Sequence, residues 1–185
     1  MSGPTSGEQV SAGASLRALD LFSGCGGLSL GFHAAGFDIA AAMDVDPVAA
    51  ASHGTNFHPG FPKHAQGRDL TVITPCRLAR ELDVGDVAGA FEVVVGDPPC
   101  QAFARVGRSK LRAVDADPDA FRADPRARLN APYLRYVESC LPLTVLIENV
   151  PDVMNFRGRN VAEQICAALE SLGYVCAYTL LNAAF

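Results

Sequence analysis

Two residues of the sequence have the side-chain types that covalent catalysis requires. Cys100 follows Pro98-Pro99 just after the apolar run FEVVV, and Glu148 ends a second apolar run, TVLIE. Two prolines fix the backbone and would present the thiol rigidly, while nearby arginines would favour the reactive thiolate. A carboxyl at the end of an apolar strand is expected to be partly buried, and burial favours the protonated form that can donate a proton.

Together, the thiol and the carboxyl predict nucleophilic catalysis with acid assistance. A thiolate can add to an electrophilic carbon of a substrate while a carboxyl supplies or holds a proton, and the covalent intermediate divides one difficult step into two easier ones. Taken singly, Cys100 could instead be a buried structural cysteine, and Glu148 could be a carboxylate bonded to turn amides.

A glycine-rich turn and an acid indicate a nucleoside site. The strand expected at 18–22 runs into Ser23-Gly24-Cys25-Gly26-Gly27, and the strand expected at 38–43 ends at Asp44. Glycines let the backbone approach a ligand, and an acid at this position accepts hydrogen bonds from ribose hydroxyls. The turn lacks the full G-x-G-x-x-G spacing, so a tight structural turn remains an alternative and a nicotinamide-dependent oxidoreductase is disfavoured.

All of these clusters follow expected strands. Further strands are expected at 91–95, 143–147 and 174–181, and helices from Leu28, from Asp46-Pro47, over 129–140 and after Asn160. Such alternation predicts an α/β fold, a mostly parallel sheet with helices on both faces, whose ligands bind beyond the carboxyl ends of the strands. Residues 104–128 are expected to form a long surface loop, which in a compact domain is more often functional than idle.

The segment DLFSGCGGLSLGFHAAGF at Asp20–Phe37 closely resembles the first motif of the cytosine-5 DNA methyltransferases, which binds S-adenosylmethionine. The resemblance implies a Rossmann-like methyltransferase fold. It places Asp44 at the ribose, where the family usually has Glu. It also implies a set of cofactor-binding residues: Phe22, Gly24 and Gly26 at the methionine end, Val45 and Asp69 at the adenine, and Pro98 and Leu129 elsewhere in the pocket.

Two later segments resemble the catalytic motifs of the same family. GDPPCQAFARVGR matches the nucleophile motif, with Cys100 as nucleophile and Gln101 and Arg105 on the catalytic loop. ENV matches the motif whose Glu148 engages cytosine N3. Asp97 departs from the family pattern, where Gly is commoner. Members of the family flip the target base out of the duplex, so the resemblance implies methylation of a flipped cytosine in double-stranded DNA, in a restriction-modification setting.

The resemblance stops before the region that reads the DNA sequence. Family members continue past LNA with a target-recognition region, whereas this sequence ends at Phe185. We therefore expect a flexible tail at 1–15 and a C-terminally incomplete catalytic domain at 16–185. The chain would be a subunit of a split enzyme or a fragment, inactive alone and in need of a complementing polypeptide. The resemblance favours the bacterial cytoplasm, in association with the nucleoid.

Composition limits the partners. The net charge of −5 has the wrong sign for a protein that binds DNA unaided, although four basic residues gather at 105–112. The six cysteines form no CxxC pair, so neither a metal site nor a disulfide framework is expected. No apolar run reaches the roughly 20 residues of a membrane span.

Three alternatives remain open at this point. A transfer-RNA cytosine-5 methyltransferase would carry the same motifs. A non-catalytic fragment that binds S-adenosylmethionine would fit the missing half, although Cys100 and Glu148 are intact. An amino-methyltransferase would use Asp97-Pro98-Pro99 but needs an aromatic residue where Cys100 stands, and gives the ENV segment no role.

Overall fold

The structure is a computed structural model that describes residues 15–99, 130–155 and 160–182. The predicted N-terminal tail falls outside these ranges, apart from Ser15. The same holds for the nucleophile Cys100 and for three further predicted site residues, Gln101, Arg105 and Leu129. The described residues lie before and after these positions in the sequence.

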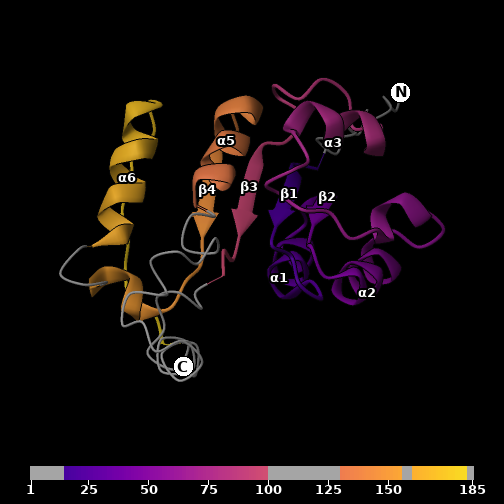
Figure 1. Cartoon of the computed structure of the whole chain (residues 1–185), viewed down its shortest axis with the longest axis horizontal. Coiled ribbons are helices and arrows are strands. Elements are labelled where there is room, and N and C mark those ends of the chain that lie inside the picture. The colour runs from indigo at the N-terminus through magenta and orange to yellow at the C-terminus, as the bar shows by residue number, and fades with distance from the viewer. Residues whose placement is uncertain (1–14, 100–129, 156–159, 183–185) are drawn as a thin grey trace, which may run out of the picture.

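Within the described residues, four parallel strands form the sheet (Figure 1). They are β1 (Arg17–Leu21), β2 (Asp38–Met43), β3 (Val93–Gly96) and β4 (Thr144–Ile147), in the order β2-β1-β3-β4. All three strand pairs are parallel, as the alternating pattern predicts. Their carboxyl ends therefore meet along one edge of the sheet, which confirms the predicted fold class.

Helices cover both faces of this sheet. α1 (Gly27–Ala34) and α2 (Pro47–Phe57) contribute Leu28, Phe32 and Phe57 to one face, against Val93 and Val95. The other face is covered by α3 (Pro75–Leu82), α5 (Asn130–Cys140) and α6 (Val161–Ser171). Its core is a single cluster that includes Leu19, Leu21 and Val94 from the strands and Leu78, Tyr133, Tyr136 and Leu169 from the helices.

Helix ends follow from side chains in the sequence. The Asp46 carboxylate accepts the amides of Val48 and Ala49, which starts α2, and the Asn160 side chain accepts the amide of Glu163, which starts α6. Both helix starts are as predicted, and in each the short polar side chain satisfies free amides of the first turn. Two 3₁₀ helices, η1 (Pro62–Ala65) and η4 (Pro151–Asn155), follow α2 and β4.

The predicted strand at 174–181 is wrong. No residue of this segment belongs to a strand in the described part of the chain, although it is apolar and follows Gly173 as expected. A strand requires a partner for its backbone groups, and the described residues offer it none. Leu180 and Leu181 are accordingly 63% and 83% exposed.

Candidate cofactor and catalytic site

The turn after β1 adopts a backbone that few residues tolerate. Gly24 and Gly26 have φ of 53° and 102°, and Phe22 has φ of 63° although it carries a side chain. A bulky residue in the left-handed region is strained, and such strain concentrates at functional sites. A Cβ at Gly26 would lie 2.4 Å from Phe57 Cε2, so the turn rests directly on α2.

Asp44, at the end of β2, is tied to this turn. Its Oδ2 accepts the Gly24 amide at 2.8 Å and its Oδ1 accepts the Asp46 amide at 2.8 Å. Each carboxylate oxygen can accept a further hydrogen bond, and the residue is half-buried rather than enclosed. Val45 beside it is 68% exposed, an apolar side chain open to a ligand. These features fit a nucleoside with its ribose at Asp44.

Asp69 lies close to Asp44 through the backbone, but its side chain has a local partner. The Arg68 amide donates to the Asp44 carbonyl at 2.7 Å. Asp69 Oδ1 accepts the Thr71 amide at 2.8 Å and the Thr71 hydroxyl at 2.7 Å. The carboxylate therefore closes a turn, and its contact with adenine stays a prediction.

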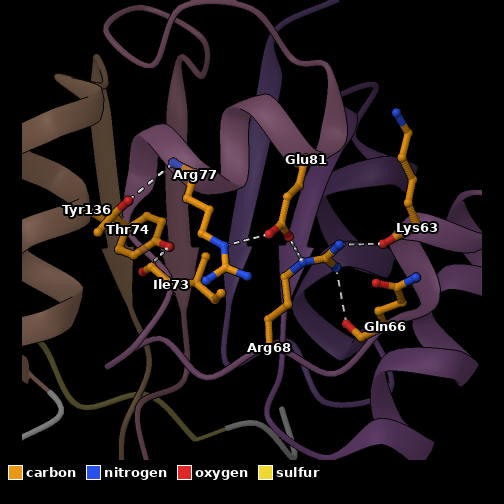
Figure 2. A network of polar contacts seen from close by, with 8 residues as sticks. All are labelled: Lys63, Gln66, Arg68, Ile73, Thr74, Arg77, Glu81 and Tyr136. Atoms are coloured by element: carbon orange, nitrogen blue, oxygen red, sulfur yellow. Dashed lines mark hydrogen bonds and ion pairs between the residues drawn. The ribbon is translucent and has the colours of Figure 1, made fainter.

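A buried guanidinium holds the chain between Asp44 and α3 (Figure 2). Arg68 is 6% exposed. Its Nε donates to Glu81 Oε2 at 3.0 Å, and its remaining nitrogens donate to the carbonyls of Lys63 at 2.7 Å and Gln66 at 3.2 Å. Glu81 also accepts from Arg77 Nε at 2.7 Å. Hydrogen bonds from Arg77 and then Arg68 lower the pKa of Glu81, so the ion pair persists at neutral pH. No signal in the sequence indicates this network.

The two catalytic motifs meet at the carboxyl ends of β3 and β4. Gly96 is in register with Ile147, and the Glu148 amide donates to the Gly96 carbonyl at 3.0 Å. One step further, Asn149 Nδ2 donates to the Pro98 carbonyl at 3.0 Å. The polypeptide that leads into Cys100 is thus bonded to the segment that carries Glu148. The position of the thiol itself lies outside the described residues.

The expected burial of Glu148 is wrong. Glu148 is exposed, and β4 alternates between exposed and half-buried residues. The physical reason is that β4 is the outer strand of the described sheet, with β3 on one side only.

The carboxyl with a raised pKa in this region is that of Asp97. It remains exposed at the edge of the sheet, but protein atoms behind it partly desolvate it. This desolvation, and then the hydrogen bond and negative charge of Glu148, raise the pKa of Asp97 to about 6. Sequence reasoning singled out Asp97 as a departure from the family pattern and as part of an amino-methyltransferase motif. It did not pair Asp97 with Glu148, because that pairing depends on strand register.

A comparison with protein families shows to which family the chain is related. The family model of C-5 cytosine-specific DNA methylases matches residues 16–185. The chain belongs to this family. Members of the family use S-adenosylmethionine, which agrees with the cofactor that the resemblance of the first motif implies.

Curated relatives of this chain are bacterial type II methyltransferases. M.XorII of Xanthomonas oryzae pv. oryzae is 36% identical over 169 residues, which cover 90% of this chain and 36% of the relative. M.AquIA of Picosynechococcus sp. is 33% identical over 176 residues, covering 91% of this chain and 65% of the relative. The chain spans about a third of the length of relatives such as M.XorII, 36% in that case.

A solved structure supports the methylase fold. A protein described as a DNA modification methyltransferase encoded within a prophage of E. coli superposes with a TM-score of 0.60 at 27% identity. The match covers 85% of this chain and 38% of that one. None of the described helices is long and apolar enough to cross a membrane. The described residues also contain no cluster of three or more metal-ligating side chains.

Proposed function

We propose that this chain carries the catalytic part of an enzyme that transfers a methyl group from S-adenosylmethionine to carbon 5 of cytosine in double-stranded DNA. The observation that carries the proposal is the hydrogen bond from Asn149 Nδ2 to the Pro98 carbonyl at 3.0 Å. It joins the strand end before Cys100 to the strand end of Glu148, the two side chains that the chemistry requires in one site.

The residues around the turn suit the cofactor. We assign the methionine end to Phe22, Gly24 and Gly26, and the ribose to Asp44, whose oxygens can each accept a further bond. Val45 would pack on the adenine. Asp69, Pro98 and Leu129 complete the proposed pocket. When bound, S-adenosylmethionine supplies a methyl group on an electrophilic sulfonium.

The chain's own residues would do the remaining chemistry. The Cys100 thiolate would add to carbon 6 while Glu148 holds a proton at N3, and carbon 5 would form a bond to the methyl carbon as the methyl–sulfur bond breaks and S-adenosylhomocysteine leaves. Loss of the carbon 5 proton to a base and elimination of the Cys100 sulfur restore the aromatic ring. Gln101 and Arg105, which follow the nucleophile, would contact the flipped nucleotide. The Asp97 carboxyl, which is hydrogen-bonded to Glu148, would help to hold that proton.

Activity requires more polypeptide, in our proposal, and a groove marks where it binds. The groove has a volume of about 450 Å³ and lies between β4, α6 and the extended segment 174–180. Apolar and aromatic side chains in its walls include Val145, Ile147, Val161, Ile165, Leu169 and Tyr174. Relatives such as M.XorII carry nearly two thirds of their length beyond the matched part. We propose that the corresponding part of this enzyme, on the same or a separate chain, fills the groove and supplies target recognition.

A methyl-transfer assay tests this function. Tritiated S-adenosylmethionine would be incubated with mixed-sequence DNA and this chain, alone and with the product of the downstream reading frame. We expect sequence-specific labelling of DNA only with both components, and placement of the label on carbon 5. Labelling of transfer RNA but not DNA would favour the transfer-RNA alternative. Robust labelling by this chain alone would refute the need for more polypeptide. Because its proposed substrate is DNA, the enzyme would be associated with the nucleoid in the bacterial cytoplasm.

A further inference from the structure

Three buried polar side chains form a continuous series of hydrogen bonds beneath the turn at Gly24–Gly26. Asp20 lies in β1, Ser29 in α1 and His53 in α2, and they are 0%, 0% and 1% exposed. The Ser29 hydroxyl donates to Asp20 Oδ2 at 2.6 Å, and Ser29 Oγ lies 2.9 Å from His53 Nε2. None of the three has a role in the function proposed above.

The direction of the hydrogen bonds follows from the number of protons. The Ser29 hydroxyl has one hydrogen and gives it to Asp20, so His53 Nε2 must carry a hydrogen and donate it to Ser29 Oγ. Burial, and then the neighbouring His58, lower the pKa of His53 to about 4, so a single neutral tautomer serves at physiological pH. The hydrogen bonds therefore run in one direction, from His53 in α2 to Ser29 in α1 and on to Asp20 in β1.

The hydrogen-bonded series of Asp20, Ser29 and His53 contacts the turn itself. A Cβ at Gly26 would lie 3.1 Å from His53 Cδ2 as well as 2.4 Å from Phe57 Cε2, so His53 and Phe57 form the surface on which the turn rests. α1 begins directly after Gly26, with no side-chain cap and no acid in its first turn. Asp20 supplies the missing negative charge, because it accepts hydrogen bonds from both the side chain and the backbone of Ser29.

Stability alone is a poor explanation for this arrangement. Asp20 Oδ1 and His53 Nδ1 are buried and have no hydrogen-bond partner in the described part of the chain. Unsatisfied buried polar atoms lower stability, and apolar side chains of similar size would avoid that loss. Such costs are typical of sites where geometry serves a function.

We infer that Asp20, Ser29 and His53 are positioning residues that hold the turn at Gly24–Gly26 in the geometry that receives the cofactor. The inference rests on the cofactor site proposed above. Because the three side chains are buried, they would act on the ligand only through the backbone of the turn. They determine how the backbone of the turn is presented to it.

Hydrogen–deuterium exchange of the free protein tests the positioning without any ligand, and calorimetric titration with S-adenosylmethionine tests its consequence. Ser29→Ala removes the central link, and His53→Phe keeps an aromatic ring against Phe57 but removes the donor. His53→Gln restores a donor. Thr55→Ala is the matched control, since its hydroxyl bonds only to the Ala51 carbonyl at 2.8 Å on the exposed face of α2.

In Ser29→Ala and His53→Phe we expect amides of the peptide 22–32 to exchange about tenfold faster, with α6 unchanged and cofactor affinity reduced about tenfold. His53→Gln should recover most of both, and Thr55→Ala should match the wild type. Unchanged exchange in the first two variants would overturn the inference. If the two variants show faster exchange of the turn but the wild type itself binds no S-adenosylmethionine, the positioning role is supported. The proposed cofactor site is then refuted.

Discussion

The Gly24 amide donates to Asp44 Oδ2 across 2.8 Å, which joins the strained turn after β1 to the acid after β2. The two groups proposed to hold opposite ends of one ligand are therefore fixed to each other before the ligand binds. Preorganisation of this kind lowers the entropic cost of binding. It also means that a change at Asp44 affects the turn as well as the ribose contact.

Asp44→Ala should weaken S-adenosylmethionine binding by roughly 10- to 100-fold, because a hydrogen bond to a charged group contributes about 1.5–3 kcal/mol. Isothermal titration calorimetry would measure the change. Asp38→Ala is the matched control, because Asp38 begins the same strand at the opposite, exposed end. Equal affinities for Asp44→Ala and the wild type would remove Asp44 from the site.

Gly26→Ala should destabilise the fold by about 1–3 kcal/mol, since overpacking costs this much and φ of 102° disfavours a side chain. Gly27→Ala is the control at the next residue, where a Cβ meets nothing within 4 Å. Urea denaturation would give both values. Comparable stability of the two variants would show that the turn does not rest on Phe57 as described.

Cys100→Ser should abolish covalent capture of DNA that contains 5-fluorocytosine. Fluorine at carbon 5 cannot leave as a proton does, so the enzyme with its complementing part should remain attached through Cys100. Denaturing gel electrophoresis would detect the adduct, and calorimetric titration would show separately whether the serine variant still binds S-adenosylmethionine. An adduct that persists in the serine variant would refute the assignment of the nucleophile.

Glu148→Gln should lower turnover by about 10²–10⁴, the range typical of general acid–base groups. Folding should change little, because Glu148 is exposed and Gln keeps its shape. The variant Asp97→Asn distinguishes the roles of the two acids. Because the pKa of Asp97 is raised to about 6, a fall in rate on acidification near pH 6 should move to another pH in this variant, while most of the maximal rate remains. Near-normal turnover of Glu148→Gln would leave that residue without a catalytic role.

Much of this framework could be predicted because its causes are local. The apolar run of β2 gave both of its ends, and Asp46-Pro47 and Asn160 start helices through bonds to amides two or three residues away. The failures depend on distant partners. Glu148 is exposed because β4 is the outer described strand, and 174–181 is no strand because the described residues offer it no strand partner.

The features that sequence reasoning missed also depend on contacts between elements. Arg68 reaches Glu81 across 13 residues, and Ser29 reaches His53 across 24. Arg, Ser and His each occur on ordinary surfaces, so composition does not distinguish a buried one. Only the packing of α2 and α3 on the sheet shows that these side chains are enclosed.

Asp20 and His53 should affect stability with opposite pH dependence, although they belong to one hydrogen-bonded chain. Burial raises the pKa of Asp20 from 3.8 to about 6 and lowers that of His53 from 6.5 to about 4. A raised carboxyl pKa favours the folded state at low pH, and the advantage is lost as pH rises through about 6. A lowered histidine pKa favours it above 6.5, and the advantage is lost as pH falls towards 4.

Paired variants separate these contributions, because subtracting a variant from the wild type cancels the other titrating groups. Between pH 5 and 7.5, the stability of the wild type relative to Asp20→Asn should fall by about 1–2 kcal/mol, from the shift in pKa and the linkage relation. Relative to His53→Gln it should rise by about 2 kcal/mol over the same interval. Urea denaturation at both pH values measures each difference. Parallel pH profiles for all three proteins would mean that neither side chain is held in the buried environment described.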